Sequence, residues 1–70
     1  MDNYKIIWGP EREAGGILVR LFDPMGTEID WTWIPADETE DMAEYHFRVE
    51  GSLPESEMGH VAHEHKEEVK

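Results

Sequence analysis

Hydrophobic and polar residues alternate on both sides of a turn signal within residues 16–34. Residues 23–26 read Asp-Pro-Met-Gly, which is typical of a type I turn followed by a left-handed glycine. A hairpin closed by this turn pairs residues whose numbers add up to 50. The pairs expected on one face are Leu21–Ile29, Val19–Trp31 and Ile17–Trp33, and those on the other are Arg20–Asp30, Leu18–Thr32 and Phe22–Glu28. A shift of one residue would scramble the apolar face, so the pattern predicts this register.

Residues 3–8 (NYKIIW) and 45–50 (YHFRVE) have the composition and alternation of two further strands. The first is expected to lie antiparallel beside the first strand of the hairpin. The acidic segment 35–44 is predicted equally as a short helix or as a solvated loop. Ser-Leu-Pro-Glu at 52–55 matches a helix-capping pattern, so residues 53–66 are interpreted as a weak C-terminal helix.

Together these elements predict an α+β fold that is mostly β, with a small four-stranded antiparallel sheet built on the 16–34 hairpin and a short C-terminal helix. Residues 1–70 are expected to form one small acidic domain, with a core in residues 3–58 and a weak helix or frayed tail over 59–70. The expected core residues are Tyr4, Ile6, Trp8, Ile17, Val19, Leu21, Ile29, Trp31, Trp33, Tyr45, Phe47 and Val49. The C-terminal segment is a thin cover for this face, so a second copy of the sheet or a partner is expected to cover the remainder.

The 70 residues include no cysteine, which excludes disulfides and thiolate metal sites. The sequence has no apolar run long enough to span a bilayer and no signal-peptide pattern at its N-terminus. From these features we expect a complete small protein with a cytoplasmic location.

Seventeen acidic residues against six basic ones give a formal net charge of −11, and residues 35–70 hold eleven of the acids. Such a charge repels nucleic acid and anionic membranes and attracts cationic surfaces. The expected partner is therefore a basic protein or a nucleic-acid-binding protein, with no direct contact to nucleic acid or membrane. The candidate partner-binding residues are Asp37, Glu38, Glu40, Asp41, Glu44, Glu55, Glu57, Glu64, Glu67 and Glu68.

Three histidines near the C-terminus, His60, His63 and His65, are weak candidates for metal ligands, since helical spacing would pair them with glutamates. Their spacing does not match H-E-x-x-H, and the sequence supplies no second pair of ligands. The sequence therefore predicts no metal site and no cofactor. A solvated, pH-sensitive tail is the simpler interpretation of these histidines.

Signs of catalysis are also absent from the sequence. Neither serine near the C-terminus lies in a nucleophile motif, and no glycine pattern forms a phosphate-binding loop. Carboxylate pairs arise by chance in so acidic a chain. The aromatic residues have few bases among them, which favours a place in the core over nucleic-acid binding.

The leading hypothesis is a non-enzymatic acidic binding protein, a stoichiometric inhibitor or nucleic-acid mimic that blocks a basic partner. In size, acidity and lack of a catalytic motif, the chain resembles the loose class of small phage-encoded inhibitors that includes anti-CRISPR proteins and DNA mimics. The hypothesis requires the tryptophans to lie inside and the acids to converge on one surface. The alternatives are a homo-oligomeric structural or accessory subunit, a metal-binding module using the histidines, and acidity that serves only solubility or adaptation to salt.

Overall fold

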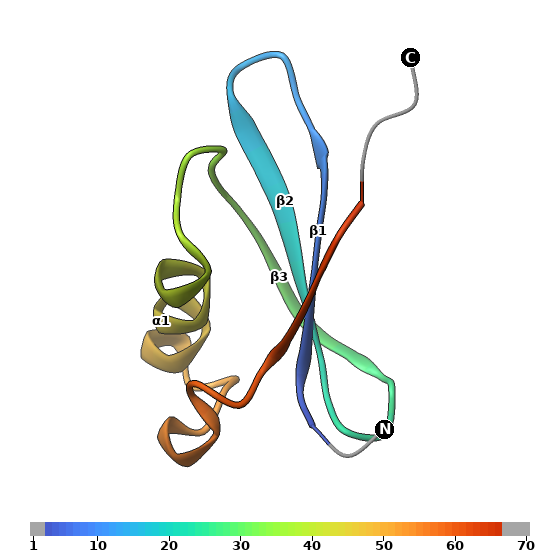
Figure 1. The fold of residues 1–70 in the computed structure, drawn as a ribbon, viewed down its shortest axis with the longest axis vertical. Coiled ribbons are helices and arrows are strands. Elements are labelled where there is room, and N and C mark those ends of the chain that lie inside the picture. Colours follow the sequence, from blue (N-terminus) through green and yellow to red (C-terminus); the bar gives the residue numbers. More distant parts are fainter. Residues whose placement is uncertain (1–2, 67–70) are drawn as a thin grey trace.

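The computed structural model describes residues 3–66, which form a four-stranded sheet with one helix against one of its faces (Figure 1). The elements in chain order are β1 (Lys5–Glu11), β2 (Gly16–Phe22), β3 (Glu28–Pro35), α1 (Glu40–Glu50), a single 3₁₀ turn (Glu55–Glu57) and β4 (Ala62–His65). The sheet order is β3-β2-β1-β4. The prediction of a mostly β fold with a four-stranded sheet and one helix is therefore confirmed at this level.

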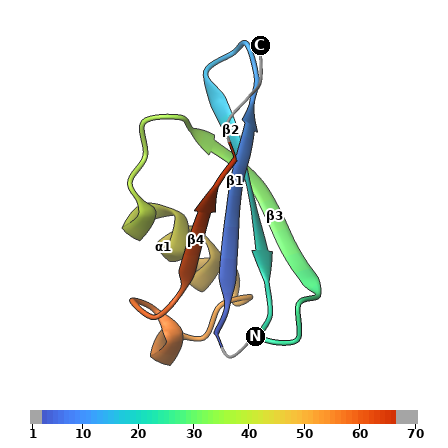
Figure 2. The same ribbon diagram turned by 45° about the vertical axis from the view of Figure 1, so that its right-hand side comes forward.

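The sheet is mixed, which corrects the expectation of a purely antiparallel one. The three N-terminal strands pair antiparallel, as expected for β1 and β2, but β4 pairs parallel to β1. Because β3 and β4 are the two edge strands and run in the same direction, the chain has to cross the sheet between them. Helix α1 makes this crossing on one face of the sheet (Figure 2).

The turn of the predicted hairpin is confirmed. The backbone N–H of Gly26 donates to the carbonyl of Asp23 at 2.8 Å, and Gly26 has a φ of +91°, which suits a residue without a side chain. The carboxylate of Asp23 accepts from the N–H groups of Met25 and Thr27 at 3.0 and 2.9 Å. These bonds hold the turn in the conformation that its residue types favour.

The predicted register of the hairpin is wrong beyond its first pair. Phe22 lies opposite Glu28 as expected, but the next residue of β2, Leu21, lies opposite Asp30. Ile29 is thus the extra residue of a β-bulge, and every later pair is shifted by one. The bulge turns the alternate set of β3 side chains toward the helix.

This shift changes which residues of β3 are buried. Ile34 takes a core position and is 2% exposed, while Trp31 on the other face is 55% exposed. The hydroxyl of Ser52, just after α1, donates to the carboxylate of Asp30 at 2.6 Å, on the face where the original register placed two tryptophans. The shifted register thus turns Asp30 toward Ser52, just after α1.

Residues 45–50, predicted as a strand, belong to α1. The hydroxyl of Thr39 accepts from the N–H of Met42 at 3.2 Å and caps the first turn, and Gly51 ends the helix at a φ of +90°. Ala43 and Phe47, four residues apart, face the core. The prediction failed because the same residues alternate in polarity as a strand does, and the capping signals at both ends outweigh that alternation.

The predicted C-terminal helix over 53–66 is also wrong. Pro54 precedes only one 3₁₀ turn, and residues 62–65 form the edge strand β4. Gly9 allows this strand to approach β1, since it has a φ of +114° and an added Cβ would lie 2.8 Å from the carbonyl oxygen of Lys66. The strand is therefore part of the sheet, and its position depends on a glycine in β1.

The core lies between α1 and the sheet. Nine hydrophobic side chains are buried there: Ile6, Trp8, Ile17, Val19, Leu21, Ile34, Ala43, Phe47 and Leu53. Four residues expected in the core are exposed, namely Ile29, Trp31, Tyr45 and Val49. Two more, Tyr4 and Trp33, are half-buried. The exposure of Ile29 and Trp31 follows from the bulge in β3. The exposure of Tyr45 and Val49 follows from the helix at 45–50.

Candidate functional site

Most of the candidate acidic residues lie in one layer of the molecule. Residues 35–57 run from the end of β3 through α1 to the 3₁₀ turn, all on one side of the sheet (Figure 1). The exposed and half-buried acids of this segment are Asp37, Glu38, Glu40, Asp41, Glu50, Glu55 and Glu57. We call these seven residues the acidic α1 layer; among residues 35–57 the only lysine or arginine is Arg48.

Four candidates fall elsewhere. Glu44 is buried. Glu64 lies on β4, on the face of the sheet away from α1, and its carboxylate is 2.7 Å from the ammonium of Lys5. Glu67 and Glu68 lie outside the described residues. Among residues 3–66, the expected acids that lie together are those of the segment around α1, where Glu50 joins them.

Glu44 belongs to a buried hydrogen-bonded chain that joins α1 to β4 and β1. The indole N–H of Trp8 donates to Nδ1 of His63 at 2.9 Å, and Nε2 of His63 is 2.6 Å from Oε2 of Glu44. The other carboxylate oxygen accepts from the N–H of Gly59 at 2.8 Å. Because an indole N–H can only donate, Nδ1 has to accept, and a neutral imidazole then carries its proton on Nε2 and donates to Glu44. The chain has one direction and is satisfied at every atom named.

A second pair of the same kind lies one helical turn away. The imidazole of His65 is 2.9 Å from the carboxylate of Glu40 and stacks on Trp8, with ring centroids 4.9 Å apart. This pair is about half exposed, whereas the side chains of His63 and Glu44 are 8% and 6% exposed. The hydrogen bond with His65 lowers the pKa of Glu40. Together the two pairs fasten the edge strand to the helix.

His63 and His65 thus belong to the folded domain, whereas the sequence suggested a solvated tail. His63 and His65 lie on the same face of β4, and His60 is exposed before the strand. Within residues 3–66 no group of three or more His, Asp or Glu side chains is arranged to hold a metal ion. The absence of a metal site and of a cofactor stays a prediction.

The face of the sheet away from α1 carries large apolar side chains, of which Trp31 and Trp33 were expected in the core. The core residues of β1 and β2 point toward α1, so their neighbours point to the other side. We call this surface the open sheet face; its apolar members are Ile7, Leu18, Phe22, Trp31 and Trp33, and its charged members are Lys5, Arg12, Arg20, Glu28 and Glu64. No described segment covers it (Figures 1 and 2). The signal for it was in the sequence, since β2 is apolar on both of its faces.

Basic and aromatic groups are interleaved on the open sheet face. The guanidinium of Arg12 lies 4.3 Å from the ring centroid of Trp33, and that of Arg20 lies 5.6 Å from the ring of Phe22. Arg20 also contacts Glu28 at 3.4 Å. With Lys5 paired to Glu64, the three bases and two acids leave this face close to neutral, in contrast to the acidic α1 layer.

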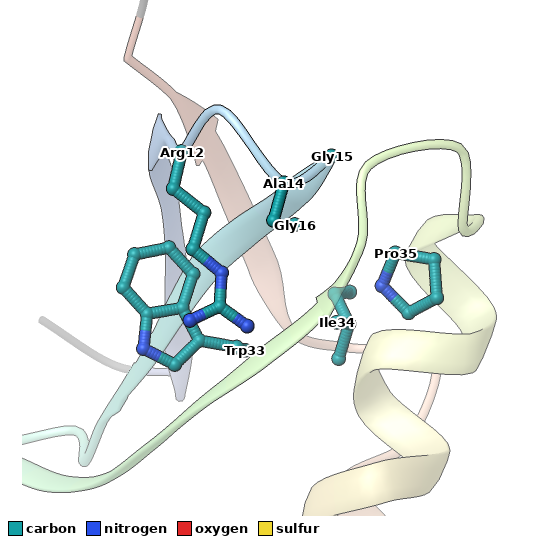
Figure 3. Close-up of a pocket in the computed structure, with 7 residues that line it drawn as sticks. All are labelled: Arg12, Ala14, Gly15, Gly16, Trp33, Ile34 and Pro35. Atoms are coloured by element: carbon teal, nitrogen blue, oxygen red, sulfur yellow. The ribbon is translucent and has the colours of Figure 1, made fainter.

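A hollow of about 310 Å³ lies at one end of the open sheet face (Figure 3). Arg12 reaches across the hollow toward Trp33. Gly16 provides space for the Arg12 side chain, since a Cβ at this position would lie 3.0 Å from Nε of Arg12. The lining residues are Arg12, Ala14, Gly15, Gly16, Trp33, Ile34 and Pro35. Arg12 is the one ionisable group among them, so this hollow supplies no acid–base pair for catalysis.

Comparisons with protein families, with curated proteins and with solved structures found no match for this chain. No helix among residues 3–66 is long and apolar enough to cross a membrane. The function therefore has to be argued from the two surfaces described above.

Proposed function

We propose that this chain is a non-enzymatic binding protein that presents the acidic α1 layer to a basic protein partner and blocks it stoichiometrically. The observation that carries the proposal is the segregation of charge between the two sides of the molecule. Residues 35–57 contain eight acids and one base, whereas three of the six bases lie on the open sheet face. A surface of one sign attracts a surface of the other and quickens its encounter.

One condition of the hypothesis from the sequence is not met. The tryptophans were required to lie inside, but Trp31 is 55% exposed and Trp33 is half-buried, both on the open sheet face. This exposure is on the far side of the sheet, behind the core that supports α1. The proposal therefore rests on the helical layer alone, where Ala43 and Phe47 anchor the helix and its acids other than Glu44 are exposed.

Two of the ten candidate acids are better understood as structural. Glu44 is buried against His63, and Glu40 pairs with His65. Replacing either would disturb the attachment of β4 as well as the surface charge. The acids suited to a test of binding are Asp37, Glu38, Asp41, Glu50 and Glu55, for which the structure records no ion pair within residues 3–66.

A capture experiment with two charge-matched double variants tests the proposal. Asp41→Asn with Glu55→Gln removes two charges from the acidic α1 layer, and Glu11→Gln with Glu13→Gln removes two exposed charges from the end of β1 and the loop that follows it. We expect a basic protein to be retained from a lysate at low salt by the natural chain and by the second variant. The first variant should lower the association rate with that protein about tenfold at low salt. Equal losses in the two variants would contradict the assignment of the surface.

A further inference from the structure

We infer that the open sheet face is the docking surface for a second copy of this chain, so that the two copies pack sheet against sheet and expose their acidic α1 layers on opposite sides. The sequence left self-association open as an alternative function. The fold adds which face is used and what the contact does to the acidic surfaces. The inference stands whether or not a basic partner exists.

The first argument is the apolar character of the face. Ile7, Leu18, Phe22 and Trp33 are only half-buried, and Trp31 is more than half exposed. They lie on three adjacent strands, with Arg20 between Ile7 and Trp31, so most of the side chains on this face are apolar and the bases lie among them. A sheet that is apolar on both faces needs cover on both, and the described residues supply α1 on one face only. Patches of this kind on a small domain mark an interaction surface.

The second argument is charge. The chain carries a net charge of −11, so two copies repel each other wherever acidic surfaces meet. The open sheet face is the exception, because Lys5 and Arg20 are paired there with Glu64 and Glu28, and Arg12 has no ion pair within residues 3–66 and is cationic. A surface with both signs of charge can complement itself about a two-fold axis. A strongly acidic partner would gain little from a face so close to neutral.

The distance between the acidic layers supports the same arrangement. Sheets pack about 10 Å apart, and a helix about 10 Å across lies on the outside of each sheet. The two helical layers of the dimer would then be about 30 Å apart. Charges separated by more than the Debye length of about 8 Å at physiological salt are largely screened. The contact therefore buries apolar surface without bringing the acids together.

The size of the face sets the expected strength. Four strands at about 4.8 Å spacing and seven residues at about 3.3 Å give a projected area of roughly 440 Å² per copy. Accessible area exceeds projected area on a rough surface, yet it stays near or below the ~800 Å² per partner of a standard interface. We therefore expect a reversible dimer with a dissociation constant of about 10–100 µM.

Sedimentation velocity over about 1–500 µM tests the inference with two matched variants. Trp31→Lys places a charge on the open sheet face, and Val49→Lys places the same charge on the outer side of α1, where Val49 is 60% exposed. We expect the natural chain and Val49→Lys to shift from monomer to dimer over this range. Trp31→Lys should raise the dissociation constant at least about tenfold, with an unchanged circular dichroism spectrum.

Salt separates this contact from binding to a basic partner. Raising NaCl should strengthen or preserve the dimer, because it screens the residual repulsion, whereas it should weaken a complex held by the acidic α1 layer. A monomer at every concentration, equal weakening by the two variants, assemblies that grow beyond a dimer, or dissociation by salt would each overturn the inference. Binding of a single-stranded oligonucleotide to a monomer, lost in Trp31→Lys, would overturn it in favour of a nucleic-acid platform.

Discussion

Glu44→Gln exchanges one oxygen of a buried carboxylate for an amide nitrogen. The hydrogen bonds from Trp8 to His63 and from His63 to Glu44 cannot reverse their donors and acceptors to accommodate it. Glu44 accepts from His63 at 2.6 Å and from Gly59 at 2.8 Å. A glutamine has one oxygen to offer, so in either orientation its NH₂ group meets a donor. His63 cannot respond by moving its proton to Nδ1, because the indole N–H of Trp8 already donates there.

The size of the effect follows from burial. Loss of a hydrogen bond to a charged group costs about 1.5–3 kcal/mol, and relief from burying a charge offsets part of it. We expect a net loss of about 2 kcal/mol in the free energy of unfolding. For a domain of this length that corresponds to a fall in Tm of about 8–16 °C.

Glu40→Gln is the matched control, with the same substitution one turn earlier in α1. Its partner His65 also lies on β4, but both side chains are 53% exposed. Such a pair contributes about 0.5 kcal/mol or less because water and salt screen it. Thermal unfolding followed by far-ultraviolet circular dichroism measures both variants. Equal Tm values for the two variants, or an unchanged Tm in Glu44→Gln, would refute the fixed order of donors and acceptors from Trp8 through His63 to Glu44.

Three further predictions concern single residues. Thr39→Ala removes the hydroxyl that caps α1 and should lower stability by about 1 kcal/mol, or Tm by about 4–8 °C. Gly9→Ala places a Cβ against the carbonyl of Lys66 at a positive φ, so amide exchange should speed up in β4 before it does in the hairpin. The Lys5 ammonium lowers the pKa of Glu64, so this pair stabilises the fold above the ordinary glutamate pKa and the effect is lost as pH falls through the lowered value. In Lys5→Met an NMR titration should show the pKa of Glu64 raised, and an unchanged value would contradict the pairing.

In the hairpin, local sequence signals determine the turn but not the strand register. Residues 23–27 determine their own turn, because the hydrogen bonds of Asp23 and the conformation of Gly26 are made within this segment. Beyond the turn the bulge at Ile29 shifts the register, and Asp30 then contacts Ser52, 22 residues away. No alternation pattern within the strand contains that contact.

The two elements that were assigned wrongly differ in kind. For α1 the capping residues Thr39 and Gly51 were present in the sequence, and they decide between a helix and an alternating strand. For β4 no local signal suffices, because its partner β1 is distant and the contact between Trp8 and His63 joins residues 55 positions apart. Contacts between residues distant in the sequence select this strand.

The acidic composition of the candidate site could be predicted from the sequence, but the positions of some of its residues in the fold could not. The acidity of residues 35–57 was evident, but burial of Glu44 and the transfer of Glu64 to the opposite face depend on the helix and the strand that were misassigned. The open sheet face was predicted only in part. Leu18 and Phe22 were expected on it, whereas Trp31 and Trp33 lie there because the register is shifted by one.

The most direct test of the account is the salt dependence of binding to the basic protein that the chain captures. Titration calorimetry at several NaCl concentrations between 50 and 500 mM, on the natural chain and the Asp41→Asn, Glu55→Gln double variant, supplies it. The account predicts an affinity that falls steeply with salt in the natural chain and less steeply in the variant, whose acidic α1 layer has lost two charges. Equal slopes, or an affinity that salt leaves unchanged, would contradict a role for this layer in binding.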